Sequence, residues 1–392
     1  MEKNMKAKTV TPSKGALIPA SNGLNPAVLE VLKKGIESGF FSAVLLPVKV
    51  PSDDSYAWVL TSQDSLLEKA NVLPPVMTVQ GGKALSSLTK HGASKMKIAA
   101  VMRPCEIRAA IELAKLKQID LENVLLISMD CPGALPIQNY VDNPIEGEKN
   151  FSDAVQNDDV EPMRPTCKTC THFSITSPDL HIATMGVTGD SILLVPSSAK
   201  GHSFLDEVGV NVETDASSWS SEIEKLTEAR KSSKQKAVAE IKEQTSGFAN
   251  FAEVLSKCIS CHNCMSVCPV CYCRRCYFES DVSELSTEQY MARSAQKGSI
   301  RLSQDVLLFH LGRMSHMTMS CVSCGSCEDA CPVDIPIAQI FSAVGDDSQS
   351  LFEYIPGMSP DDPLPLRIFS KDKELCDIER ICADPLKGCD SK

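Results

Sequence analysis

The segments CISCHNCMSVCP (residues 258–269) and CVSCGSCEDACP (residues 321–332) follow one pattern, C-x2-C-x2-C-x3-C-P. In this pattern three thiolates on a tight turn bind one cube-shaped 4Fe-4S cluster, and the fourth cysteine binds the other cube. Zinc is the weaker interpretation, because one zinc ion takes four tetrahedral ligands and the two runs supply twice that number. The spacing therefore predicts one cluster on Cys258, Cys261, Cys264 and Cys331, and a second on Cys321, Cys324, Cys327 and Cys268.

The segment between the two runs is longer than a compact two-cluster ferredoxin needs, so it must itself fold. Val306, Phe309 and Arg313 recur at helical spacing, and a second stripe consists of Leu307, Leu311 and Met314. We therefore expect a mainly α-helical two-cluster domain over residues 257–342. It resembles the helical ferredoxin domain of heterodisulfide reductase small subunits and succinate dehydrogenase iron-sulfur subunits. With enough thiolates present, we interpret His262, His310 and His316 as packing or hydrogen-bonding residues.

Composition and charge disfavour some classes of binding partner and some locations. The 392 residues carry 39 Lys and Arg against 50 Asp and Glu, a net charge of −11, which disfavours nucleic acid or an anionic membrane as a partner. No apolar segment is long enough to span a bilayer, and the N-terminus has no export signal. We therefore expect a cytoplasmic protein without membrane insertion, whose 18 cysteines bind metal rather than form disulfides.

The first part of the chain, residues 1–210, has α/β character. FSAVLLPVKV (residues 41–50) is typical of a buried strand and follows a helix that begins near Asn25 and Pro26. KMKIAAVM (residues 95–102), a helix over residues 106–118 and NVLLISM (residues 123–129) then predict a βαβ crossover with parallel strands.

Cysteines follow both strands of this crossover. Cys105 comes after the first strand and Cys131 after the second. Parallel strands joined by a crossover end at the same edge of a sheet, where open α/β sheets bind their ligands. If the loop TCKTC brings Cys167 and Cys170 over this edge, four thiolates meet there. We expect a third 4Fe-4S cluster on this quartet, with a zinc site or unlinked thiols as the alternatives.

The remaining segments are less specific. Residues 211–256 are charged and Ser-rich, which predicts an exposed linker helix, and the proline-broken residues 343–392 are expected to wrap over the preceding domain. Arg274 and Arg275 lie beside unassigned thiols and are candidate basic residues near the clusters. Six cysteines stay unassigned: Cys271, Cys273, Cys276, Cys376, Cys382 and Cys389.

Three blocks of the first part carry a family resemblance: VMRPCEIRAAIEL (residues 101–113), VLLISMDCPGALP (124–136) and RPTCKTCTHFSITSPDLHIATMGVTG (164–189). They resemble the beta-subunit family of deazaflavin (F-420) dependent hydrogenases and dehydrogenases, most of all its formate dehydrogenase branch. The resemblance implies FAD in the α/β domain beside an iron-sulfur cluster. The family commonly has Gly-Thr-Pro before its first cluster cysteine, where this chain has Met102-Arg103-Pro104. We expect the flavin near Arg103 and Pro104.

No dinucleotide or Walker-type fingerprint is present, and we interpret Gly81-Gly82-Lys83 as an ordinary loop rather than a phosphate site. No acid-base pair or nucleophile stands out either, so catalytic residues stay unassigned.

Clusters pass single electrons, whereas deazaflavin and nicotinamide coenzymes take hydride, so a flavin would link the two. The sequence therefore predicts an iron-sulfur flavoprotein subunit of an anaerobic oxidoreductase, with a formate dehydrogenase alpha-type or hydrogenase subunit as its catalytic partner. The alternative is a relay without its own substrate, which links formate dehydrogenase to a heterodisulfide-reductase-like, electron-bifurcating complex. The third and weaker hypothesis is that the chain is a structural or sensor protein.

Overall fold

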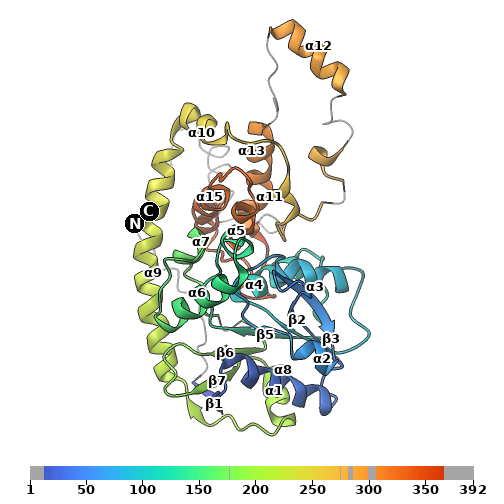
Figure 1. Cartoon of the computed structure of the whole chain (residues 1–392), viewed down its shortest axis with the longest axis vertical. Helices are drawn as coiled ribbons and strands as arrows, with labels where there is room; N and C mark the ends of the chain where they lie inside the picture. The colour runs from blue at the N-terminus through green and yellow to red at the C-terminus, as the bar shows by residue number, and fades with distance from the viewer. Residues whose placement is uncertain (1–12, 176, 274, 281–285, 299–305, 366–392) are drawn as a thin grey trace, which may run out of the picture.

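The computed structural model describes residues 13–175, 177–273, 275–280, 286–298 and 306–365. Figure 1 shows a sheet-containing part at one end of the molecule and a group of helices at the other. Arg274 and three of the unassigned cysteines, Cys376, Cys382 and Cys389, lie outside the described residues.

The first part is built on an eight-stranded sheet with the order β3-β2-β4-β5-β6-β7-β1-β8. The pairs β2–β4, β4–β5 and β5–β6 are parallel, and the outer pairs are antiparallel. The α/β expectation with parallel strands is therefore confirmed. The strands are β1 Lys14–Pro19, β2 Ala43–Lys49, β3 Tyr56–Thr61, β4 Ile98–Val101, β5 Val124–Met129, β6 Leu180–Ala183, β7 Ser191–Pro196 and β8 Thr214–Asp215.

The predicted crossover is β4, α4 (Pro104–Lys115) and β5, with Ile98 opposite Val124 in the parallel register. Every residue of β4 and β5 is buried, as expected for strands covered on both faces. The helix begins two residues before the predicted start. Pro104 occupies its first turn, and the Glu106 carboxylate accepts the Arg103 N–H at 2.9 Å. It also ends earlier, and Lys117 beyond it has a left-handed φ of 60°.

The other helices of the first part lie around this sheet, in the connections between its strands (Figure 1). They are α1 Leu24–Glu37, α2 Asp64–Leu67, α3 Gly81–Thr89, α5 Ile137–Val141, α6 Pro144–Gln156, α7 Pro165–Lys168 and α8 Ala199–Glu207. The glycines expected in a loop at 81–82 instead form the first turn of α3. Its Gly81 N–H donates to the Glu106 carboxylate at 2.9 Å, so a protein carboxylate already occupies this helix N-terminus.

The second part is helical, as expected. It consists of α10 Gly247–Leu255, α11 Asn263–Ser266, α12 Thr287–Lys297, α13 Val306–Met317, α14 Ser326–Asp329 and α15 Ile337–Leu351, with 3-10 turns at Tyr277–Glu279 and Thr318–Ser320. Of the two predicted stripes on α13, Phe309 and Arg313 are buried, whereas Leu311 is 45% exposed. Helix α15 crosses the domain boundary predicted at residue 342.

A long helix, α9 (Ser217–Gln244), runs beside both parts (Figure 1). Trp219 at its start packs on the sheet with Leu193 and Val195. Further along, Lys234 pairs with Asp346 of α15 at 2.7 Å. The segment predicted as an exposed linker helix thus buries side chains against both parts. No described helix has the length and apolar content needed to cross a membrane.

Candidate iron-sulfur site

The two ligand runs fold alike. Ser260 and His262 in the first run have φ of 55° and 57°, and Ser323 and Gly325 at the same positions of the second have 55° and 79°. These left-handed residues turn the chain so that the backbone curls around the cysteines, and the short helices α11 and α14 follow. Gly325 is required by space as well, because a Cβ there would lie 2.1 Å from Thr166 Oγ1 of the upstream loop.

The structure brings the first predicted quartet together. Its four cysteines line one pocket of about 310 Å³ with His310 and Phe309. Donors reach the sulfurs: Arg313 Nη1 lies 2.9 Å from Cys264 Sγ, and the Ser260 N–H lies 3.4 Å from Cys258 Sγ. The four members are Cys258, Cys261, Cys264 and Cys331, so the fourth cysteine of the second run does cross to the first.

The second predicted quartet is also grouped, and none of its four cysteines is exposed. Burial, followed by the charges of its neighbours Cys268, Cys324 and Cys321, raises the pKa of Cys327 well above its ordinary value. Burial raises the pKa of Cys268 too, again with Cys324 and Cys321 as neighbours. Cys268 of the first run therefore lies among the cysteines of the second.

The upstream quartet converges at the edge of the sheet. Cys131 follows β5, Cys105 lies in the first turn of α4, and Cys167 and Cys170 lie in and just after α7. Burial and then the charges of Glu106, Cys324, Cys131 and Cys170 raise the pKa of Cys105. Cys170 in turn has Cys167 and Cys131 as charged neighbours. Because Cys324 of the second quartet is among the charged neighbours of Cys105, the upstream quartet lies next to the second quartet.

Burial acts on the charge state of these thiols. Burial raises the pKa of Cys264 to about 11, against the opposing effect of Arg313, so a bound metal would have to supply the charge that keeps such thiols deprotonated. Among the described residues, no three His, Cys, Asp or Glu side chains converge closely enough to hold one metal ion. The four thiolates of a cube bind four different irons and stand further apart than ligands of one ion.

The histidines are not grouped as ligands. His262 stacks on Phe309 with ring centroids 4.3 Å apart and contacts Glu279 at 3.0 Å. His310 Nε2 lies 3.4 Å from Cys258 Sγ, and His316 is exposed. Among the unassigned thiols, Cys271 lies near Cys273 and Cys276.

The Arg103 side chain is buried and contacts the upstream quartet rather than solvent. It is 3% exposed, and Nη1 donates to Cys131 Sγ at 3.0 Å and to the Gly133 carbonyl at 2.5 Å, while Nη2 reaches the Pro74 carbonyl. Pro104 is the first residue of α4. A narrow pocket lies beside Arg103 and is also lined by Trp58, Tyr56 and Glu106.

Sequence reasoning missed the other buried arginines. Arg108 and Arg164 are 4% and 3% exposed and have thiols of both the upstream and second quartets as charged neighbours. Arg313 appeared only as a member of a helical stripe. The basic residues expected beside the clusters were Arg274 and Arg275, and Arg275 is exposed. The available signal was position, since Arg108 and Arg164 stand three residues from Cys105 and Cys167 on helical segments.

Comparisons with known proteins agree with this geometry. Residues 253–335 match the 4Fe-4S dicluster domain family. The F420-dependent formate dehydrogenase subunit beta of Methanocaldococcus jannaschii is 28% identical over 343 residues, which is 80% of this chain and 85% of that protein. The F420-dependent formate dehydrogenase 1 subunit beta of Methanococcus maripaludis is 29% identical over 373 residues, 86% of this chain and 92% of the relative.

A chain from the xenon-derivatised F420-reducing NiFe hydrogenase complex of Methanosarcina barkeri superposes with a TM-score of 0.45 at 11% identity, over 64% of this chain and 97% of that chain.

The fold and the matched domain define an iron-sulfur protein, in which an α/β part precedes a helical 4Fe-4S dicluster domain. Over most of its length, the chain is similar to the beta subunits of F420-dependent formate dehydrogenases.

Proposed function

We propose that this chain is the beta-type subunit of a formate dehydrogenase or hydrogenase complex and transfers electrons between a catalytic partner subunit and a deazaflavin or nicotinamide coenzyme. The observation that carries the proposal is the serial arrangement of three four-thiol groups. Cys268 joins the second group although its run supplies the first, and Cys105 of the upstream group has Cys324 of the second as a neighbour.

The proposed ligands of the three 4Fe-4S clusters are the three quartets. When bound, such clusters supply one-electron transfer at potentials set by charge, hydrogen bonds and exposure. The chain contributes these conditions: Arg103 and Arg313 donate to thiol sulfurs, and burial raises the pKa of Cys105 in the upstream quartet and of Cys327 in the second. Domain limits at residues 210 and 256 remain part of the proposal, whereas α15 (Ile337–Leu351) continues through the limit at residue 342.

The FAD site is proposed at the pocket beside Arg103. Trp58 and Tyr56 give it aromatic walls, and the buried Arg103–Glu106 pair forms its polar end. In the described structure the pocket has room for little more than a water molecule, so a flavin ring would have to displace the side chains that line it. Because Arg103 also contacts Cys131, a flavin ring there would lie next to the upstream quartet.

The catalytic partner is proposed to dock at the first quartet, the one nearest the surface. Cys261 is exposed, and the neighbouring Ile259 is 61% exposed. An electron-donating partner needs such access, since the other two quartets lie behind it in the molecule. The surface there carries an apolar side chain that a partner would cover.

Flavin content and coenzyme reactivity test this function. Anaerobically purified protein should contain about one FAD, and reduced deazaflavin coenzyme should bleach the cluster absorbance. Trp58→Ala should lower flavin content several-fold while iron content stays unchanged. The exposed Tyr290→Ala, on α12, serves as the control and should change neither.

The outcomes separate the competing functions. Protein without FAD that is nevertheless bleached by reduced viologen would support a relay without its own substrate, linked to a heterodisulfide-reductase-like complex. Clusters that viologen fails to bleach would contradict electron transfer altogether and favour a structural or sensor role.

A further inference from the structure

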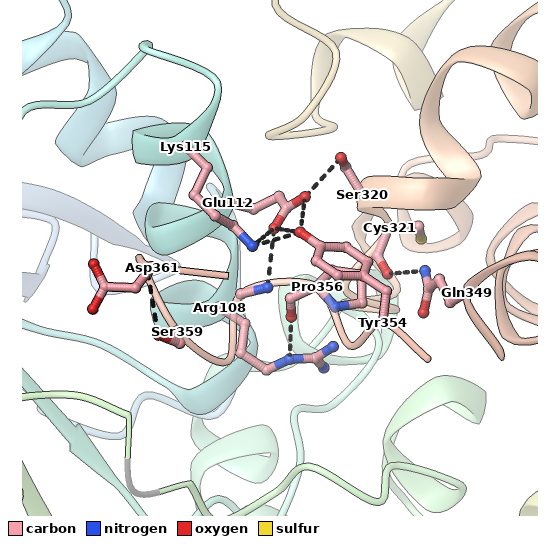
Figure 2. Close-up of polar contacts among 11 residues, drawn as sticks. Arg108, Glu112, Lys115, Ser320, Cys321, Gln349, Tyr354, Pro356, Ser359 and Asp361 are labelled. Atoms are coloured by element: carbon pink, nitrogen blue, oxygen red, sulfur yellow. Dashed lines mark hydrogen bonds and ion pairs between the residues drawn. The ribbon is translucent and has the colours of Figure 1, made fainter. Parts of the chain in front are cut away.

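One face of α4 connects the upstream quartet to the helical part. Cys105, Arg108, Glu112 and Lys115 recur every three or four residues and therefore lie on the same side of the helix. Figure 2 shows Arg108, Glu112 and Lys115 reaching toward Ser320, Tyr354 and Pro356 of the second part. The helix that carries a ligand of one cluster thus touches the segment that carries a ligand of the next.

Glu112 fixes this contact. Its carboxylate is fully buried and accepts hydrogen bonds from the Tyr354 hydroxyl at 2.7 Å, the Ser320 hydroxyl at 2.8 Å and the Gly357 N–H at 3.0 Å. Lys115, 5% exposed, balances its charge at 3.0 Å. Because Ser320 immediately precedes Cys321, the network holds the start of the second ligand run against α4 (Figure 2).

Arg108 lies at the centre of the junction. Nε donates to the Pro356 carbonyl at 2.9 Å and Nη1 to the Val322 carbonyl at 3.2 Å. The thiols that act on its charge belong to both groups: Cys170 and Cys105 upstream, and Cys321 in the second quartet. Among the described residues Arg108 forms no ion pair, whereas Arg164, with a similar set of thiol neighbours, is paired with Asp329 at 3.3 Å. The Arg108 charge, which also has Glu112 as a neighbour, is therefore not taken up by a salt bridge and acts on thiolates of both quartets.

We propose that Arg108 is a shared potential-setting residue, which raises the reduction potentials of the upstream and second clusters together. This inference rests on the proposed function, because it needs a cluster on each quartet. Transfer moves one electron, and the donor cube is oxidised as the acceptor cube is reduced, with no bond or proton changed. A fixed cation stabilises the more negative, reduced form of either cube, and its effect is strong where burial keeps solvent and salt away.

Because one charge acts on both clusters, it moves the two potentials in the same direction. The difference between the two potentials, which is the driving force for transfer, therefore changes less than either potential does. Burial lowers the pKa of Arg108, and the surrounding thiolates oppose that shift; arginine nevertheless stays protonated in proteins.

The test is a redox titration, followed by electron paramagnetic resonance, of the full chain with Arg108→Met. Both the upstream and second couples should shift to lower potential by at least about 59 mV. For one electron, this shift equals a tenfold change in the ratio of oxidised to reduced cluster. The couples are assigned by their loss in Cys131→Ala and Cys327→Ala variants. Arg108→Lys, which keeps the charge, should leave both near the wild-type potential.

Arg230→Met is the matched control. Arg230 is also buried, with Nη1 3.4 Å from the Cys170 carbonyl and its guanidinium 4.1 Å from the Phe173 ring centre, and both of these contacts are with the segment that carries Cys167 and Cys170. Its loss should shift the upstream couple alone.

A shift of only one couple, or of neither, in Arg108→Met would overturn the inference. If Arg108→Met loses iron, Arg108→Gln, which keeps a hydrogen-bond donor, replaces it in the titration. Loss of iron in both uncharged variants would make Arg108 a structural residue and also overturn the proposal. A wild-type chain with about 8 iron and two couples would instead contradict the third cluster of the proposed function.

Discussion

Buried arginines beside thiols are the main residue-level feature of this protein. Each quartet has a buried arginine near its thiols. Arg103 contacts the Cys131 sulfur and Arg313 contacts the Cys264 sulfur, whereas Arg108 has Cys105 and Cys321 as charged neighbours. Cubes held by four thiolates carry net negative charge, and burying that charge is costly without a counter-charge nearby. The chain is acidic overall, so the cations are placed locally, where the thiols are.

The Glu112–Lys115 pair gives a residue-level prediction. In Glu112→Gln, Lys115 would remain buried without a counter-charge, which destabilises a protein by about 3 kcal/mol. Denaturant unfolding of the iron-loaded protein measures this loss. Glu30→Gln removes a pair whose side chains are 48% and 71% exposed, so it should cost less than about 1 kcal/mol. Equal effects of the two variants would refute the buried junction.

At the scale of elements, α4 and α9 hold the two parts together, but the ligand runs depend on their metal. Helices α11 and α14 have four residues each and follow left-handed turns, so they cannot persist on backbone hydrogen bonds alone. By contrast, β4 and β5 are buried in a sheet that does not contain the cysteines.

Removal of iron should therefore affect these elements unequally. Iron-free protein, prepared anaerobically with a chelator, should lose hydrogen-exchange protection in α11 and α14 by at least tenfold, while β4 and β5 remain protected. Exchange that is unchanged in the ligand runs would show that the metal does not organise them.

At the scale of the whole molecule, the sequence predicted the α/β part, the helical part and the groups of cysteines, because strand periodicity and ligand spacing are local signals. It also predicted that Cys105 and Cys131 meet, since crossover topology places strand ends at one edge. The buried arginines and the packing of α9 on both parts were not predictable in this way. Arg108 meets Val322 and Pro356 only through long-range folding, and its spacing of three residues from Cys105 indicates nearness to the upstream thiols but not this contact.

The central claim is that three thiol quartets hold three 4Fe-4S clusters in series. Anaerobic iron and sulfide quantification of wild type and Cys131→Ala, with Cys273→Ala as an exposed control outside the quartets, tests it most directly. We predict about 12 iron in the wild type and the control, and about 8 in Cys131→Ala. About 8 iron in the wild type, or an iron content that Cys131→Ala leaves unchanged, would contradict the account.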